Sequence, residues 1–302
     1  MCFPVLAGLM MLQGKREYTE KKLARRSLAA MVIAACFLVW NLTGDPQSLH
    51  LCSLGKDLPV YFHVDAIGKL FASVVTLVWI LAICFAGEYM KKEQDQKRFF
   101  GFFLIVYGVL MGLCYAGNLI TFYLFYEMMT LTTVPLVLHT RTREAITAGM
   151  KYLLYSLSGA YLVLFSTYML NRYTTSLNFT PGGTLDLAAA EGHTTLILVC
   201  ACLMILGFGV KAGMFPMHGW LSTAHPAAPA PASAVLSGVI VKMGVLGAIR
   251  VVYEIIGPEM IRGTWVQTVW LTLSLITVFM GSMLAYREKI LKKRLAYSTV
   301  SQ

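Results

Sequence analysis

The chain has 302 residues, of which 57% are hydrophobic and 13% are charged. Soluble domains usually carry about 25% charged residues, so this composition excludes an ordinary water-soluble globular protein. The formal net charge of +10 suggests a nucleic-acid-binding protein only until the positions of the basic residues are considered.

Apolar runs of about 18 or more residues recur along the chain, and runs of this length are typical of transmembrane helices. Helices are expected because hydrocarbon offers no hydrogen-bond partner to an exposed backbone amide. Residues 3–13 indicate the end of one further apolar helix, and no basic region precedes them as it would in a cleavable signal peptide. The sequence therefore predicts an all-α polytopic membrane protein with about eight or nine transmembrane helices. The predicted spans are 27–42, 66–87, 99–115, 117–138, 146–170, 194–214, 232–256 and 265–286.

The basic residues are distributed unevenly about these spans. Seventeen of the 25 lysines and arginines fall in four segments that the spans place on one side of the membrane: 15–26, 91–98, 141–143 and 287–294. The opposite loops hold only Lys56, Arg172 and Arg262. Because loops rich in lysine and arginine stay in the cytoplasm, we expect the four segments on the cytoplasmic face of a cell (inner) membrane. The charge reflects topology, so the expected partner is the lipid bilayer and not nucleic acid.

Motifs for a bound cofactor or metal are missing from the sequence. The seven cysteines include no CxxC pair, and most of them lie within predicted helices, where cysteine acts as a small apolar residue. No glycine-rich phosphate loop, nucleophile elbow or zinc-ligand spacing is present. We therefore expect no cofactor, no metal and no redox chemistry on this chain. The polar segments 43–65 and 171–193 are expected to be ordinary connections.

Glu127 lies midway along the predicted span 117–138. Tyr123 and Thr130 share its face of the helix and form a polar stripe with it. A charged side chain at this depth costs about 3 kcal/mol when it faces lipid, so Glu127 should face other helices and have a partner there. Two interpretations remain open: an ion-handling carboxylate, and a protonated glutamate that only joins helices.

Lys151 lies one to two turns into the span 146–170, with Thr147, Tyr155 and Ser158 on its face. At this depth a lysine either takes part in function or extends its ammonium group to the lipid headgroups. Both interpretations of Lys151 stay open.

Lys242 lies near the middle of the span 232–256, and the neighbours on its own helix face are apolar or glycine. Its partner must therefore come from another helix or from water. Other charged residues lie close enough to a helix end for their side chains to reach the headgroups. This group comprises Lys69, Arg250 and Glu254.

Residues 207–231 interrupt an apolar run. Lys211 closes that run, Gly213 and Pro216 follow it, and later prolines exclude a helix until Ala232. Backbone broken at membrane depth is tolerated only where it is buried in protein or lines a wet cavity, and in transporters such breaks commonly mark the ion site. The sequence therefore predicts a broken helix here. The later prolines are Pro226, Pro229 and Pro231.

Two histidines lie within the predicted break, His218 and His225. Histidine is the side chain most easily protonated and deprotonated near neutral pH, which suits a proton path. The alternative is a cytoplasmic loop in which the two histidines merely cap helix ends.

Four motifs resemble those of a known family. Together they resemble the antiporter-like membrane subunits of respiratory complex I, membrane-bound hydrogenases and multisubunit cation/proton antiporters. The resemblance runs from about residue 66 to the end, and "HPAAPAPASAVLSG" is most similar to the hydrogenase-linked branch. The motifs are "FYLFYEMMTL" (122–131), "VKAGMFPMHGWLSTAHPAAP" (210–229), "LSGVIVKMGVLGAIR" (236–250) and "KKRLAYSTVSQ" (292–302).

The resemblance implies inverted five-helix repeats, each with a discontinuous helix. It divides the chain into N-terminal transmembrane helices over 1–98, a first repeat over 99–256 and the start of a second repeat over 257–302. Ser222 and Thr223 depart from the family's usual proline and acid. The chain also ends where the family continues through its second repeat, so we expect a fragment, a split gene or a degenerate subunit.

The resemblance further implies an intramembrane proton relay. An ionised Glu127 beside Lys211 would help the lysine keep its proton, and withdrawal of the carboxylate would release that proton towards Lys242. The residues that match the family's ionisable positions are Glu127, Lys211, Lys242, His218 and His225, and Lys151 joins them from its own position.

The implied function is proton or Na⁺ translocation by a membrane subunit of a redox-driven complex. That complex would be a complex I-like NADH/quinone oxidoreductase or a membrane-bound hydrogenase. The expected partners are other membrane subunits and, through them, a peripheral redox arm that supplies the driving force. Two alternatives stay open: a cation/proton exchanger, as in a multisubunit Na⁺/H⁺ antiporter, and an inert scaffold subunit.

Overall fold

Helices make up most of the chain. The computed structural model describes residues 2–13, 20–44, 47–55 and 58–302. Eight helical segments are long and apolar enough to cross a membrane, and they follow the eight predicted spans in order. The helical elements are α1 (Cys2–Gln13), α2 (Glu20–Thr43), α3 (Ala66–Tyr89), η1 (Met90–Lys92), α4 (Gln96–Cys114), α5 (Leu119–Val137), α6 (Arg143–Leu170), α7 (Leu187–Ala190), α8 (Thr194–Ala212), η2 (Met217–Trp220), α9 (Leu221–Ala227), α10 (Ala230–Val235), η3 (Leu236–Ile240), α11 (Val241–Arg250), η4 (Val251–Ile256), α12 (Pro258–Ile261), α13 (Trp265–Arg287) and α14 (Leu291–Ser301).

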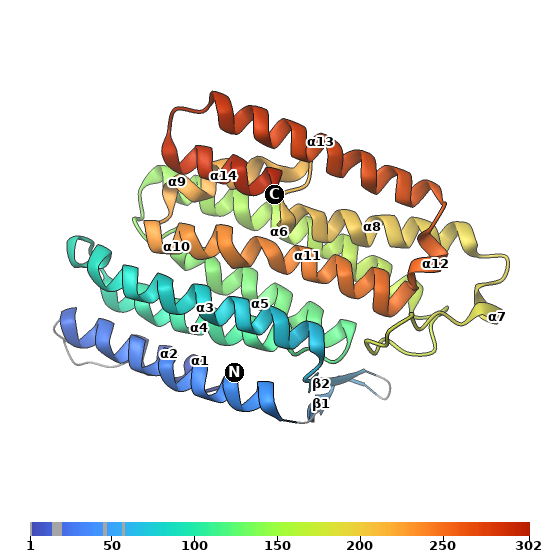
Figure 1. Cartoon of the computed structure of the whole chain (residues 1–302), viewed down its shortest axis with the longest axis horizontal. Helices are drawn as coiled ribbons and strands as arrows, with labels where there is room; N and C mark the ends of the chain where they lie inside the picture. The colour runs from blue at the N-terminus through green and yellow to red at the C-terminus, as the bar shows by residue number, and fades with distance from the viewer. Residues whose placement is uncertain (1, 14–19, 45–46, 56–57) are drawn as a thin grey trace.

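The long helices lie side by side, with α1 and α2 along one flank of the bundle and α13 along the other (Figure 1). Helix α4 is central, since 83% of its most apolar stretch is buried, whereas only 11% of that stretch in α13 is buried. Helix α6 packs on α8, and α8 packs on α11. The prediction of a polytopic helical membrane protein is confirmed.

The basic segments are more helical than predicted. Helix α2 already begins at Glu20 and α14 at Leu291, so parts of 15–26 and 287–294 are helix and not loop. Lysine and arginine are good helix formers, which extends the helices beyond the apolar stretch. Residues 15–19 lie outside the described part of the chain. The α3–α4 and α13–α14 turns lie at the same end of the bundle, opposite the hairpin, α7 and α12 (Figure 1).

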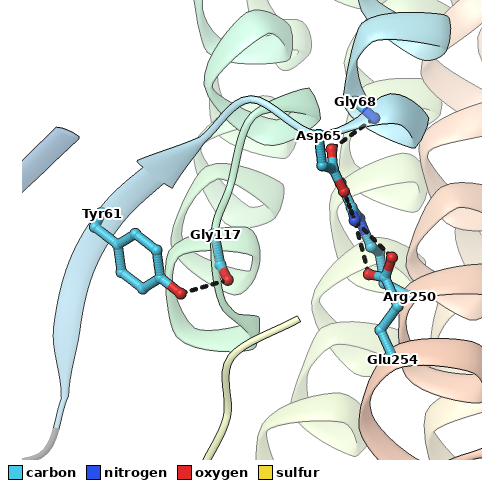
Figure 2. A network of polar contacts seen from close by, with 6 residues as sticks. All are labelled: Tyr61, Asp65, Gly68, Gly117, Arg250 and Glu254. Atoms are coloured by element: carbon cyan, nitrogen blue, oxygen red, sulfur yellow. Dashed lines mark hydrogen bonds and ion pairs between the residues drawn. The ribbon is translucent and has the colours of Figure 1, made fainter. Parts of the chain in front are cut away.

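The segment 43–65 is more than an ordinary connection, because it contains the antiparallel strands β1 (Ser48–Ser53) and β2 (Pro59–His63). The amide of His63 donates to the Tyr115 carbonyl at 2.8 Å, and the Tyr61 hydroxyl donates to the Gly117 carbonyl at 2.8 Å (Figure 2). Hydrogen bonds from strand β2 thus hold the α4–α5 connection in place.

The segment 171–193 is also ordered by backbone hydrogen bonds. The amide of Phe179 donates to the Gly117 carbonyl at 3.1 Å, and that of Thr184 donates to the Ile255 carbonyl at 2.8 Å. These bonds join the α4–α5 connection to the end of η4 and satisfy backbone groups that would otherwise be unpaired. Both polar segments connect successive spans, and both are held in place by hydrogen bonds to neighbouring elements.

The broken helix is present where the sequence predicts it. Helix α8 ends at Ala212, and Gly213 has φ +81, a left-handed conformation that glycine adopts without strain. The amide of Met214 returns to the Gly209 carbonyl at 2.8 Å, and the Trp220 indole donates to the Val210 carbonyl at 2.9 Å. The last carbonyls of α8 therefore find donors inside the break.

One detail of the break differs from the prediction. Helix α9 includes Pro226, and α10 begins at Ala230, two residues earlier than expected. Proline is tolerated in the first turn of a helix, which accounts for Pro231 in α10. In α9 the helix ends one residue after Pro226, so few hydrogen bonds are lost.

Helices α6 and α8 cross at two glycines. A Cβ atom added at Gly159 would lie 2.6 Å from the Gly207 carbonyl oxygen, and one added at Gly207 would lie 2.5 Å from the Gly159 oxygen. Paired small residues let helix backbones approach closely in membranes. This crossing holds the lysine-bearing end of α8 against α6.

We expect Gly159→Ala to lower the free energy of unfolding by about 1–3 kcal/mol, because the added methyl group has no room at this crossing. Gly87→Ala is the matched control, since its Cβ would make only an ordinary contact, 3.5 Å from Ala24. Thermal unfolding of the purified chain in detergent measures both. Equal stability of the two variants would show that the crossing is not tightly packed.

Candidate functional site

Lys211 is fully buried in the last turn of α8. Its Nζ donates to three hydroxyl oxygens: Thr130 Oγ1 at 2.8 Å, Tyr152 Oη at 3.1 Å and Ser156 Oγ at 2.8 Å. The same atom lies 4.6 Å from the centre of the Tyr152 ring and 5.6 Å from that of Tyr126. Oxygen dipoles from α5 and α6, together with two aromatic faces, therefore surround the ammonium group.

Tyr152 and Ser156 were not predicted as site residues. The sequence singled out the stripe of Lys151, Tyr155 and Ser158, but Ser158 is exposed, whereas Tyr152 and Ser156 are buried. The sequence does hold a sign of them: Tyr152 and Ser156 are four residues apart and so share a helix face next to that of Lys151 and Tyr155. Thr133 on α5 extends the network, since its hydroxyl lies 2.6 Å from that of Tyr152.

Glu127 is half-buried on α5, and the Tyr123 hydroxyl donates to its Oε1 at 3.3 Å. The ion pairs formed within the described part of the chain do not include one between Glu127 and Lys211. The two charges still act on each other at longer range. The carboxylate therefore neighbours the lysine without neutralising it through direct contact.

Lys151 and His218 approach each other beside Gly219. The Lys151 Nζ lies 3.7 Å from the position that a Gly219 Cβ would occupy, and its charge acts on His218. The His218 ring stacks on Phe215 with centroids 6.0 Å apart. Its buried Nδ1 has no hydrogen-bond partner among the described residues, which is typical of an atom that binds water.

An open groove of about 960 Å³ lies between α6, α9 and the α13–α14 turn. Lys151 lines it, together with Arg143 and Lys293. Ser222 and Thr223, the two departures from the family pattern, line it as well. The groove thus reaches from the basic end of the bundle to Lys151.

His225 is buried in α9, with 2% of its surface exposed. Its Nδ1 lies 2.9 Å from the Ser233 hydroxyl, while its buried Nε2 has no partner among the described residues. The charges of Lys242 and Lys292 both act on this imidazole. His225 is therefore buried within the break, where its one hydrogen-bond partner among the described residues is Ser233.

Lys242 has a partner that was not predicted. Its Nζ donates to the carbonyl of Ser237 on its own helix at 3.2 Å, not to another helix. The helix widens to π turns over Leu236–Ile240, and this irregular segment brings the Ser237 carbonyl within reach of Lys242. Lys242 is half-buried.

The structure thus brings the predicted residues within electrostatic range of one another in three pairs. Lys211 pairs with Glu127, Lys151 with His218, and His225 with Lys242. The hydroxyls around Lys211 and the open histidine nitrogens can pass protons, given intervening water. Across the described ranges, no three His, Cys, Asp or Glu side chains are placed to hold a metal ion.

The sequence suggested that Arg250 and Glu254 extend to the lipid headgroups, but both side chains are buried in the bundle. Arg250 is 1% exposed and forms a bidentate ion pair with Asp65, the residue that caps the start of α3 (Figure 2). It also bonds both carboxylate oxygens of Glu254, at 2.9 and 2.7 Å, and its guanidinium lies 4.8 Å from the centre of the Phe179 ring. By contrast, Lys69 does bond carbonyls at the end of α2.

We expect Arg250→Met to lower the free energy of unfolding by about 3–5 kcal/mol, because it leaves two carboxylates without their buried partner. Arg262→Met is the control, since Arg262 pairs with Glu259 at side-chain exposures of 73% and 77%. Removing such an exposed pair should cost at most about 1 kcal/mol. Thermal unfolding in detergent compares the two, and equal losses would contradict a structural role for the Asp65–Arg250 pair.

Two family models match the chain. The model described as "NADH:quinone oxidoreductase/Mrp antiporter, TM" matches residues 116–302, which is more than half of the chain. The model described as "NADH-Ubiquinone oxidoreductase (complex I), chain 5 N-terminus" matches residues 53–100. The two matches follow each other along the chain without overlap.

Curated relatives come from three kinds of complex. Hydrogenase-4 component B of Escherichia coli (strain K12) is 30% identical over 240 residues, covering 79% of this chain and 35% of that protein. A Na(+)/H(+) antiporter component of Alkalihalophilus pseudofirmus is 32% identical over 83% of this chain and 30% of its own length. NADH-quinone oxidoreductase subunit N of Desulforudis audaxviator is 25% identical over 99% and 60%. The chain thus spans between 30% and 60% of these relatives.

Solved structures show the same fold. A chain of the Mrp complex from Dietzia sp. DQ12-45-1b superposes with a TM-score of 0.80 and 23% identity, over 99% of this chain and 55% of that one. A chain of the archaeal membrane-bound sulfane sulfur reductase superposes with a TM-score of 0.75 and 21% identity, over 99% and 61%. At these identities the likeness establishes the fold alone.

Proposed function

Since the chain belongs to the family of antiporter-like membrane subunits shared by NADH:quinone oxidoreductases and Mrp antiporters, we propose that it translocates protons or Na⁺ within a larger membrane complex. The observation that carries this proposal is Lys211, an ammonium group buried among three hydroxyls and in direct contact with no carboxylate of the described residues. A buried charge without a carboxylate partner is costly, so an ammonium group in this position is a poor choice for stability alone. A group that must gain and lose a proton is better served by neutral dipoles.

The relay would run from Glu127 and Lys211 towards Lys242. Glu127 acts on Lys211 at long range, so movement of its carboxylate changes how firmly Lys211 holds a proton. His218 and His225 each supply a buried ring nitrogen that has no hydrogen-bond partner among the described residues, and both lie in the break between the two lysines. Water would bridge the gaps between these groups. Lys151, at the end of the groove, would connect the relay to the basic face.

The driving force would come from partner subunits. Relatives are named as components of a hydrogenase, a quinone oxidoreductase and a Na(+)/H(+) antiporter. The hydrogenase-linked relative and the resemblance of "HPAAPAPASAVLSG" favour a redox-driven complex with a peripheral arm. We place the chain in the cell (inner) membrane, with the basic segments cytoplasmic and the first repeat over 99–256.

We expect Glu127→Gln and Lys211→Met each to reduce ion translocation by the assembled complex at least about a hundredfold, since each removes a positioned proton-transfer group. Assembly should persist, because the hydroxyl network of α5 and α6 remains. Glu259→Gln, at an exposed carboxylate with 77% of its side chain accessible, is the control and should translocate normally. Ion flux and complex assembly are measured on the same preparations.

Normal translocation by well-assembled Glu127→Gln and Lys211→Met complexes would favour the scaffold role. The remaining alternative, a stand-alone cation/proton exchanger, is tested with the purified chain in liposomes. Na⁺ flux driven by a pH gradient across those liposomes would identify a stand-alone exchanger instead of a subunit that depends on redox partners.

A further inference from the structure

Helix α14 contacts the break through a lysine that the proposed relay does not use. The Lys292 Nζ donates to the Ala228 carbonyl at 2.9 Å and to the Pro226 carbonyl at 3.5 Å. Both carbonyls lie where α9 ends, and the last carbonyls of a helix have no partner within it. Pro229 and Pro231 follow directly and carry no backbone N–H. Lys292 supplies donors that the local backbone lacks.

A second polar contact ties α14 to the other half of the break. The Thr299 hydroxyl bonds the Ser237 hydroxyl, and the Ser237 carbonyl is the acceptor for Lys242. Lys292 and Thr299 lie seven residues apart, which places them two turns apart on one face of α14. Helix α14 is therefore hydrogen-bonded both to the end of α9, which carries His225, and to η3, which precedes Lys242.

The charge of Lys292 also acts on His225. Lys242 from α11 and Lys292 from α14 are the cations that act on the buried His225, whose other polar neighbour is Ser233 of α10. Burial lowers the pKa of Lys292, and the charge of Glu93 in the α3–α4 turn opposes that effect. Removing Lys292 would thus change both the position and the electrostatic surroundings of His225.

We propose that Lys292 is a positioning residue of the ion path: its ammonium group fixes the end of α9 and adds to the positive charge around His225. This inference rests on the proposed translocation function. It adds a residue outside the Glu/Lys/Lys relay, on the helix that follows α13. A displacement of α14 would move both halves of the break together.

The test compares Lys292→Met with Arg294→Met, which removes the same charge from an exposed position on α14, and with Lys292→Arg, which keeps a donor cation. In the full chain in detergent, amide hydrogen exchange over 221–235 should be about tenfold faster in Lys292→Met, as the loss of a charge-assisted hydrogen bond implies. Arg294→Met should match wild type, and Lys292→Arg should restore most of the protection.

The second readout is the pH profile of ion translocation by the assembled complex. Lys292→Met should shift the profile to higher pH, because a neighbouring positive charge disfavours protonation of an imidazole. Faster exchange with an unchanged profile would reduce Lys292 to a structural residue, and equal changes in Arg294→Met would overturn the proposal. If wild type itself fails to translocate ions, the proposed function fails, while the exchange data still decide whether Lys292 holds the break.

Discussion

The cost of keeping the Lys211 ammonium group out of water governs the centre of this molecule. An isolated charge in a medium of low polarity is stable only when its donors are satisfied, and here three hydroxyls on two helices satisfy them. That requirement fixes how α5, α6 and α8 face one another, and the glycine crossing of α6 and α8 makes the approach possible. Glu127 forms no direct ion pair with Lys211 and acts on it only at longer range.

The break after Lys211 raises a related problem, since polar backbone groups inside a membrane also need hydrogen-bond partners. A helix that ends inside a membrane exposes carbonyls, so the chain must supply donors from elsewhere. Trp220 supplies one for α8, and Lys292 supplies others for α9. Because Lys292 lies outside the break, its bonds connect the break mechanically to α14. At the opposite end of the bundle, Arg250 ties α11 to the start of α3 through Asp65.

The parts of this structure that could be predicted are those encoded locally. Apolar runs mark the spans, and the glycine and prolines around 213–231 mark the break. Contacts between distant residues left no such signal: Asp65 and Arg250 are 185 residues apart, and nothing near Arg250 announces a buried ion pair. Tyr152 and Ser156 were not predicted because they are uncharged, whereas the adjacent stripe contains the charged Lys151. A partner for Lys242 was expected from another helix or from water, because a π turn cannot be predicted from apolar periodicity.

The proposed function requires that Lys211 exchange a proton under the control of Glu127. The most direct measurement is solid-state ¹⁵N NMR of the Lys211 side chain in membranes, recorded as a function of pH for wild type and for Glu127→Gln. We expect a Lys211 signal that changes between charged and neutral forms, and a transition that moves when Glu127 is replaced. A Lys211 that stays charged at every pH, with the same signal in both proteins, would contradict it.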